Sequence, residues 1–344
     1  MMTGMDRIVA ALNGEKSDRI PVFCNLLDQG AKELGIATLQ EYYSKGEYVA
    51  QAQLKMREKY GYDNLWSLFY VGKEAELLGC KKIIYATDGP PNVEHFVIST
   101  YDDIAKLEIP TDLINHPAFA QERICLEILS REAKGKYPIC AYLTASMTLP
   151  ALLMGMDKWF DLLFFGPTDV RDELLRKCSA FFHQEVAAYR QAGADIILYA
   201  NPFGSTDFIP MKQFNQLSMP WMKKDLQPGG VADVVYYCGS SRMNNVIKPV
   251  VEQLAIQTFY LSPNDDVAIG KQNVAGQGLT WGVINDILLI DWTEQEVRAE
   301  VKRIIEAGMA GGKFGFGTLV MPYKIPEQNI RAMLDAAYEF GRYA

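Results

Sequence analysis

The stretch Val234–Arg242, VVYYCGSSR, is an apolar run that ends in a cysteine, a glycine and two serines. This pattern is typical of a buried strand that delivers side chains into a loop at an active site. Because side chains alternate along a strand, Tyr236 and Cys238 share one face and Tyr237 lies on the other. We expect Tyr236 and Cys238 to point into a cleft. Aromatic packing for the tyrosine and a buried thiol for the cysteine stay open as alternatives.

Similar runs recur along the chain and alternate with longer helical patterns. The predicted strands are residues 19–25, 64–69, 137–146, 194–202, 232–240, 257–265, 278–285 and 311–318. Strands that alternate with helices predict βα units and a parallel sheet. Eight such units predict an α/β fold, a single (β/α)8 TIM barrel over residues 1–344. We also expect an N-terminal helical extension, and a β-hairpin insertion after the second strand, formed by residues 81–88 and 93–99.

Active sites of such barrels lie at the carboxyl ends of the strands, so the segments that follow the strands supply the candidates. We expect catalytic roles for Asp207, Tyr236 and Cys238, and substrate-binding roles for Asn25, Tyr70, Ser146, Tyr199, Asn201 and Arg242. A phenol can donate a hydrogen bond or act as a general acid. A cysteine can bind metal or attack carbon once a neighbour lowers its pKa.

Composition excludes several classes of protein. The 344 residues carry a formal net charge of -8 without a block rich in Lys or Arg, so neither nucleic acid nor an anionic membrane is an expected partner. No apolar run approaches the length of a membrane span, and the N-terminus does not resemble a signal peptide, which predicts a cytoplasmic protein. The only histidines, His95, His116 and His183, lie away from the predicted strand ends. A His-rich metal site or a Ser/His/Asp triad is therefore not expected.

Several motifs occur in a recognisable order: GEKSDRIPVF, TASMTLPALLMGMDKW, RQAGADIILYANPFGS, VVYYCG and PYKIPEQNIRAML. Together they resemble the uroporphyrinogen decarboxylase superfamily over almost the whole chain, and within it the corrinoid-linked methyltransferases of the methylcobamide:coenzyme M type. The resemblance implies a barrel with its cleft at the carboxyl ends of the strands. It also implies methyl transfer between a small molecule and cobalamin, with the cobalamin carried by a separate corrinoid protein.

The chain departs from the decarboxylase pattern of this superfamily. The decarboxylases carry an arginine-rich RQAGR after the first strand, which binds carboxylates, and the matching stretch here is Leu26–Gly30, LLDQG. Their catalytic aspartate falls near Tyr70, and their C-terminal histidine near Leu319. A mouth without those groups is poorly suited to a porphyrin with eight carboxylates, so we do not expect porphyrin decarboxylation.

The chain also departs from the zinc pattern of the thiol methyltransferases. Their three zinc ligands match Tyr236, Cys238 and Leu319, so only the cysteine is kept. A catalytic zinc needs three protein ligands, which makes the usual zinc site doubtful. Glu74, Glu76 and His95 remain a possible alternative metal set.

The loss of zinc changes the chemistry to expect. Transfer of a methyl group from an ether or a quaternary amine to cobalt(I) needs a positioned donor and a stabilised leaving group, not an activated thiolate. Tyr236, Asn201 and Asp207 could supply that, and an aromatic cleft would suit a cation. Two alternatives stay open: a lyase or decarboxylase of a small acid held by Arg242 or Lys271, and a non-catalytic homologue that binds a corrinoid or its carrier protein.

Overall fold

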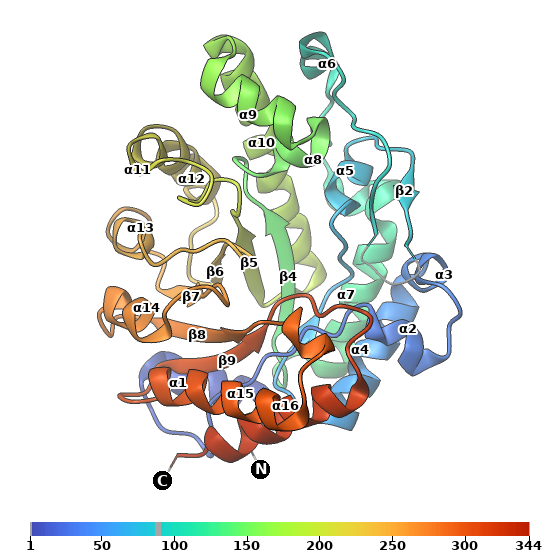
Figure 1. The fold of residues 1–344 in the computed structure, drawn as a ribbon. Coiled ribbons are helices and arrows are strands. Elements are labelled where there is room, and N and C mark those ends of the chain that lie inside the picture. The colour runs from blue at the N-terminus through green and yellow to red at the C-terminus, as the bar shows by residue number, and fades with distance from the viewer. Residues whose placement is uncertain (1, 87–90, 344) are drawn as a thin grey trace.

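The structure is a computed structural model that describes residues 2–86 and 91–343. Its centre is one parallel, curled sheet of seven strands (Figure 1). In spatial order the strands are β1 (Leu65–Trp66), β4 (Ile139–Thr144), β5 (Ile196–Ala200), β6 (Val234–Tyr237), β7 (Thr258–Tyr260), β8 (Leu279–Ile284) and β9 (Phe314–Thr318). Spatial order equals chain order, as successive right-handed βα crossovers produce. Each strand lies inside a predicted one and is shorter than it.

The first predicted strand, residues 19–25, closes along β9 without forming a regular ladder. Val22 forms a parallel bridge with Phe316, and Asn25 forms one with Val320. On its other side, the amide of Asp63 donates to the carbonyl of Val22 at 2.8 Å. The segment therefore lies between β9 and the chain that enters β1.

Side chains explain why this segment is not a continuous strand. Pro21 has no N–H to donate. The amide of Val22 donates to Oδ2 of Asp63 at 2.8 Å, and the amide of Cys24 donates to Oδ1 of Asn64 at 3.0 Å. Two side chains thus accept the hydrogen bonds that backbone carbonyls of a neighbouring strand would otherwise accept.

Helices surround the sheet (Figure 1). Those that follow or flank the strands are α4 (Gly46–Tyr60), α7 (Ala120–Ala133), α10 (Thr168–Ala192), α12 (Met219–Leu226), α13 (Ile247–Leu254), α14 (Val267–Val274), α15 (Glu294–Gly308) and α16 (Glu327–Phe340). Further helices are α2 (Gln29–Leu34), α3 (Leu39–Tyr43), α8 (Leu149–Met154), α9 (Met156–Phe165) and α11 (Met211–Gln213), with a π-turn at Phe214–Ser218 and single 3-10 turns at Leu113–Asn115, Pro117–Phe119 and Leu288–Ile290. α15 begins with a capping box, in which the Glu296 amide donates to the Thr293 hydroxyl oxygen and the Thr293 amide donates to the Glu296 carboxylate. Within the described residues, no helix is both long and apolar enough to cross a membrane.

The N-terminal helix α1 (Gly4–Asn13) covers the amino end of the sheet. Ile8 and Leu12 share a cavity of about 50 Å³ with Phe23, Tyr260 and Trp281. The last two belong to β7 and β8, so the face of the sheet that carries them is the inner one.

The insertion after β1 contains α5 (Lys73–Leu77), the strands β2 (Ile83–Ile84) and β3 (Asn92–Val93), and α6 (Tyr101–Lys106). β2 and β3 pair antiparallel over two residues each. The hairpin strands expected at 81–88 and 93–99 are mostly irregular here, and residues 87–90 lie outside the described part of the chain. A two-stranded ribbon with no further strand beside it has little to extend its pairing.

Candidate functional site

Aromatic rings line the inner face of the sheet toward the carboxyl ends of the strands. We call Trp66, Tyr142, Tyr237, Tyr260 and Trp281 the inner arc. Successive ring centroids are 4.7, 5.2, 5.9 and 5.7 Å apart. All five side chains are buried, which makes the interior a packed core and leaves substrate access to the open end above it.

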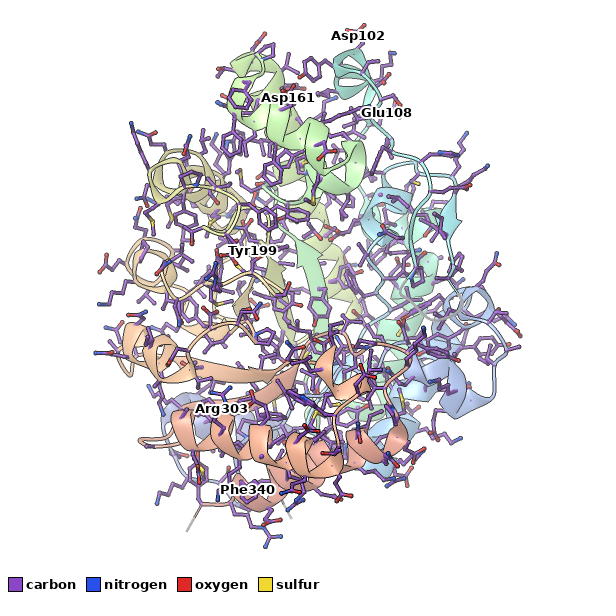
Figure 2. The ribbon with its side chains drawn as sticks, viewed as in Figure 1. Asp102, Glu108, Asp161, Tyr199, Arg303 and Phe340 are labelled. Carbon is purple, nitrogen blue, oxygen red and sulfur yellow. The ribbon has the colours of Figure 1, made fainter. Side chains whose placement is uncertain are left out.

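A second set of rings packs on the opposite face. Phe182 of α10 contacts Tyr199 at 5.2 Å, Tyr199 contacts Tyr236 at 6.3 Å, and Tyr236 contacts Phe259 at 6.0 Å between centroids. Figure 2 shows Tyr199 inside the molecule, and its hydroxyl donates to Asp225 of α12 at 2.7 Å. Tyr236 therefore faces the helices. The expectation that Tyr236 points into the cleft is wrong in orientation, and Tyr237 takes the inward position.

The helix side also holds three more of the predicted site residues. Ser146 donates through its amide and its hydroxyl to the same Oδ2 of Asp225, at 3.0 and 2.9 Å. The side-chain nitrogen Nδ2 of Asn201 lies 3.4 Å from the sulfur of Met222. Cys238 is fully buried, with its sulfur 3.6 Å from the carbonyl oxygen of Asn201. These contacts hold the loops after β4, β5 and β6 against the helix side of the sheet.

Asp207 and Arg242 lie together on the loops that follow β5 and β6. Oδ1 of Asp207 and Nη2 of Arg242 are 2.9 Å apart, and the Arg242 amide donates to Oδ2 at 2.7 Å. The Arg242 side chain is 66% exposed, so this ion pair is a rim contact that water can reach. The structure brings these two predicted residues together, but on the rim and not in the packed interior.

We call the end of the sheet where the strands finish the mouth. Asn25 lies on the inner side of this mouth. Its side-chain amide donates to the Tyr142 hydroxyl at 3.0 Å, and its backbone amide donates to Thr318 Oγ1 at 2.9 Å. Asp286 follows β8, and burial raises its pKa to about 6. Burial and the nearby Asp286 carboxyl also raise the pKa of Tyr237, so this phenol stays protonated.

A cavity of about 250 Å³ opens at the mouth. It is lined by Asp28, Tyr43, Phe69, Tyr70, Val71, Ile287, Val320, Met321 and Pro322. Phe69 also contacts Tyr142 of the inner arc, 4.9 Å between centroids. The Tyr70 hydroxyl, predicted to bind substrate, donates to Glu76 at 2.5 Å. The lining comes from the loops after the first segment, β1, β8 and β9, which is where a barrel ligand is expected.

Residues 3–340 match the protein family described as uroporphyrinogen decarboxylase (URO-D). The chain belongs to this family. Its curated relatives are named methyltransferases: methylcobamide:CoM methyltransferase MtbA of Methanosarcina mazei is 22% identical over 98% of each chain, and MtaA of Methanosarcina barkeri is 23% identical over 97% of each. A solved structure titled "methyltransferase from Methanosarcina mazei" superposes with a TM-score of 0.82 at 21% identity, covering 99% of each chain.

The fold similarity extends beyond these methyltransferases. A B12-independent methionine synthase from Shewanella sp. W3-18-1 superposes with a TM-score of 0.53 at 13% identity, covering 89% of each chain. At such identities the solved structures establish the fold alone, and the family match agrees with the resemblance noted in the ordered motifs.

The URO-D chain does not fit a zinc ion at the positions that the resemblance implies. Tyr236 packs between aromatic rings on the helix side, and Leu319 offers no ligand atom. Burial raises the pKa of the Cys238 thiol, which disfavours the thiolate that zinc binds. Across residues 2–86 and 91–343, no group of three His, Cys, Asp or Glu side chains is arranged to hold a metal.

The alternative metal set is also dispersed. Oε1 of Glu74 accepts from the Thr144 amide at 2.6 Å inside the fold. Glu76 is bound by Tyr70 and by Lys73, while His95 is exposed in the insertion.

Three residues of the mouth were not among the predicted site residues: Asp28, Tyr237 and Asp286. Asp28 and Asp286 follow predicted strands, and Tyr237 lies near the end of one, so all three are at positions that the barrel rule favours. For Tyr237, nothing in the sequence indicated which face of the strand points inward. For Asp28 the signal was present in LLDQG, which follows the first predicted strand and contains one carboxylate.

Proposed function

We propose that this URO-D family member is a corrinoid-dependent methyltransferase. It moves a methyl group between a small molecule and cobalamin, which a separate corrinoid protein carries as the second substrate. The observation that carries the proposal is the match over 97–98% of the chain to relatives named for methylcobamide chemistry. The proposal includes a complete eight-stranded barrel over residues 1–344, with residues 19–25 as its first strand, working in the cytoplasm.

The cavity at the mouth supports a small organic partner. Its volume of about 250 Å³ is near the lower end for ligand sites, which run from roughly 300 to 1,000 Å³. A corrin ring is far larger, so cobalamin would meet the donor from outside. The residues at the implied zinc positions, Tyr236, Cys238 and Leu319, do not fit a zinc ion, which favours a donor that needs no thiolate, such as an ether or a quaternary amine.

The candidate residues divide by position. Asn25 and Tyr70 are proposed to contact the small molecule, and Tyr237, close to Asp286, to stabilise the group that leaves. Asp207 with Arg242 is proposed to act at the rim. Tyr236, Cys238, Asn201, Tyr199 and Ser146 are proposed to act through the strand ends that they hold, as positioning residues.

The test mixes catalytic amounts of the protein with cob(I)alamin and a panel of methyl donors that includes aryl methyl ethers and quaternary amines. With at least one donor, methylcobalamin is expected to form, and its absorbance is used to monitor the reaction. The converse mixture, methylcobalamin with candidate acceptors, covers the opposite direction. No turnover in either direction, together with tight cobalamin binding, would instead support the non-catalytic alternative.

A further inference from the structure

The cavity at the mouth combines one carboxyl group with three aromatic rings. Asp28, Tyr43, Phe69 and Tyr70 line it, and none of its nine lining residues is Lys, Arg or His. Tyr43 and Tyr70 meet edge to face, with centroids 5.2 Å apart. The lining therefore offers aromatic rings and one carboxyl group, and no cationic side chain.

Asp28 is 1% exposed and only half satisfied. Oδ1 accepts from the Tyr43 hydroxyl at 2.6 Å, while Oδ2 has no hydrogen-bond partner among the described residues. Asp28 directly precedes α2, where an aspartate commonly caps the helix, yet it makes no capping bond. Its carboxyl group is thus held beside the cavity by a tyrosine, and the positive charge of a cation in the cavity would offset the cost of burying it.

We propose that this cavity binds a methylated ammonium ion and that this cation is the methyl donor. The inference rests on the proposed function and names its substrate class. A quaternary ammonium carries no N–H, so it is recognised by ring faces and by charge. The lining offers these two features. A neutral ether of the same size would leave the carboxyl group without a partner.

Lys73, which contacts the ring of Tyr70, does not reverse the local charge. Nζ of Lys73 lies 5.6 Å from the centroid of Tyr70. The same nitrogen is 2.8 Å from Glu76 and 3.2 Å from Glu122, so two carboxylates surround it.

The transfer step is balanced without a proton. The electron pair of cobalt(I) attacks the methyl carbon and forms the Co–C bond. The C–N bond breaks, its pair stays on nitrogen, and a neutral tertiary amine leaves. Cobalt is oxidised formally from I to III as it takes the methyl group. Loss of the positive charge weakens the attraction to Asp28 and the rings, which favours release of the product.

The test compares choline with 3,3-dimethylbutan-1-ol, its uncharged isostere, by calorimetric titration without cobalamin. Choline is expected to bind at least tenfold tighter. Asp28→Asn is expected to weaken choline about tenfold and to leave the alcohol unchanged, and Phe69→Leu to weaken choline several-fold through the lost ring face. Asp335→Asn, which removes one exposed charge on α16, is the matched control and keeps wild-type affinity.

Two results would overturn the inference: equal affinities for choline and the alcohol, or choline affinity within twofold of wild type in both cavity variants. If Asp28→Asn does not fold, Phe69→Leu and the pair of ligands still decide. The cob(I)alamin assay separates the two claims. Choline that binds without forming methylcobalamin supports the cation site and contradicts methyl transfer from it. Methylcobalamin formed from aryl ethers alone contradicts only the cation donor.

Discussion

Asp286 is the titratable residue of the mouth whose protonation state bears on ether donors, which the proposed function also admits. Burial raises its pKa to about 6, so the carboxyl group is protonated below that pH and ionised above it. An ether donor needs a proton on its departing oxygen, and Asp286 acting through Tyr237 could supply it. We therefore expect kcat/KM for an ether to fall about tenfold per pH unit above about 6. A quaternary amine, which needs no proton, should lack this limb.

A pair of variants checks the assignment. Asp286→Asn should remove the pH limb for ether donors, while Asp291→Asn, an exposed change five residues further along, should keep it. The pH–rate profile is the measurement, because a merely structural role would lower the rate at every pH. A limb that survives in Asp286→Asn would assign the acid to another group.

At this scale the sequence predicted residue types better than directions. It placed Tyr236 and Tyr237 on opposite faces but gave no means of choosing the inner one. That choice follows from register, because Tyr236 pairs with Phe259 and with Tyr199. The face of Tyr199 is set by its contacts with Phe182 of α10 and Asp225 of α12. Only a tertiary contact fixes the phase of an isolated apolar strand.

Among the helices and strands, the junction of α5, β4 and α10 holds the most unusual charges. Glu74 of α5 accepts from the Thr144 amide at the end of β4, and Glu185 of α10 is fully buried with neither oxygen bonded to a described residue. Burial raises the pKa of Glu74 from 4.5 to about 7, and burial with the nearby Glu74 carboxyl raises that of Glu185 in the same direction. Both acids are therefore favoured as neutral groups in the folded protein.

This junction predicts a stability that falls as pH rises. The folded state holds the Glu74 proton up to about pH 7, whereas the unfolded chain releases it near 4.5. The stabilisation that this proton contributes is thus fully present below pH 4.5 and is lost between pH 4.5 and 7. It amounts to at most about 3 kcal/mol. Urea titrations between pH 5 and 8 should show this slope. Glu74→Gln, which keeps an oxygen for Thr144, should flatten it, and the exposed Glu252→Gln should not. An identical slope in Glu74→Gln would place the effect elsewhere.

The sequence predicted the parallel strands because each one is an apolar run that a parallel sheet buries on both faces. The prediction failed where contacts with other segments of the chain determine whether a strand forms. The segment 19–25 has the composition of a strand, but Asp63 and Asn64 take its amides. The predicted hairpin has strand-like residues, but little beyond its own two strands supports it.

For the molecule as a whole, the N-terminal extension and the mouth are joined through Asp63. This buried carboxylate is 2.9 Å from Arg7 of α1 and 2.5 Å from Arg19, and it accepts the amide of Val22. One side chain thus ties α1 and the first segment to the chain that enters β1. Two residues of the mouth belong to this part of the chain: Asn25 ends the segment, and Asp28 follows it.

Asp63→Asn should therefore act at both ends of the molecule. It leaves Arg19 without a carboxylate and takes from Arg7 one of two, since Asp18 still pairs with Arg7 at 2.7 Å. Removing one partner of a buried ion pair costs about 3–5 kcal/mol. We expect a loss of that size in urea titrations, against less than about 1 kcal/mol for Glu300→Gln in an i,i+3 pair on the surface of α15.

The same variant should also weaken choline binding, although Asp63 is not among the residues that line the cavity, because the segment that carries Asp28 loses its anchor. Stability lost with choline affinity unchanged would show that the mouth is held by β9 alone, through the bridges of Val22 and Asn25.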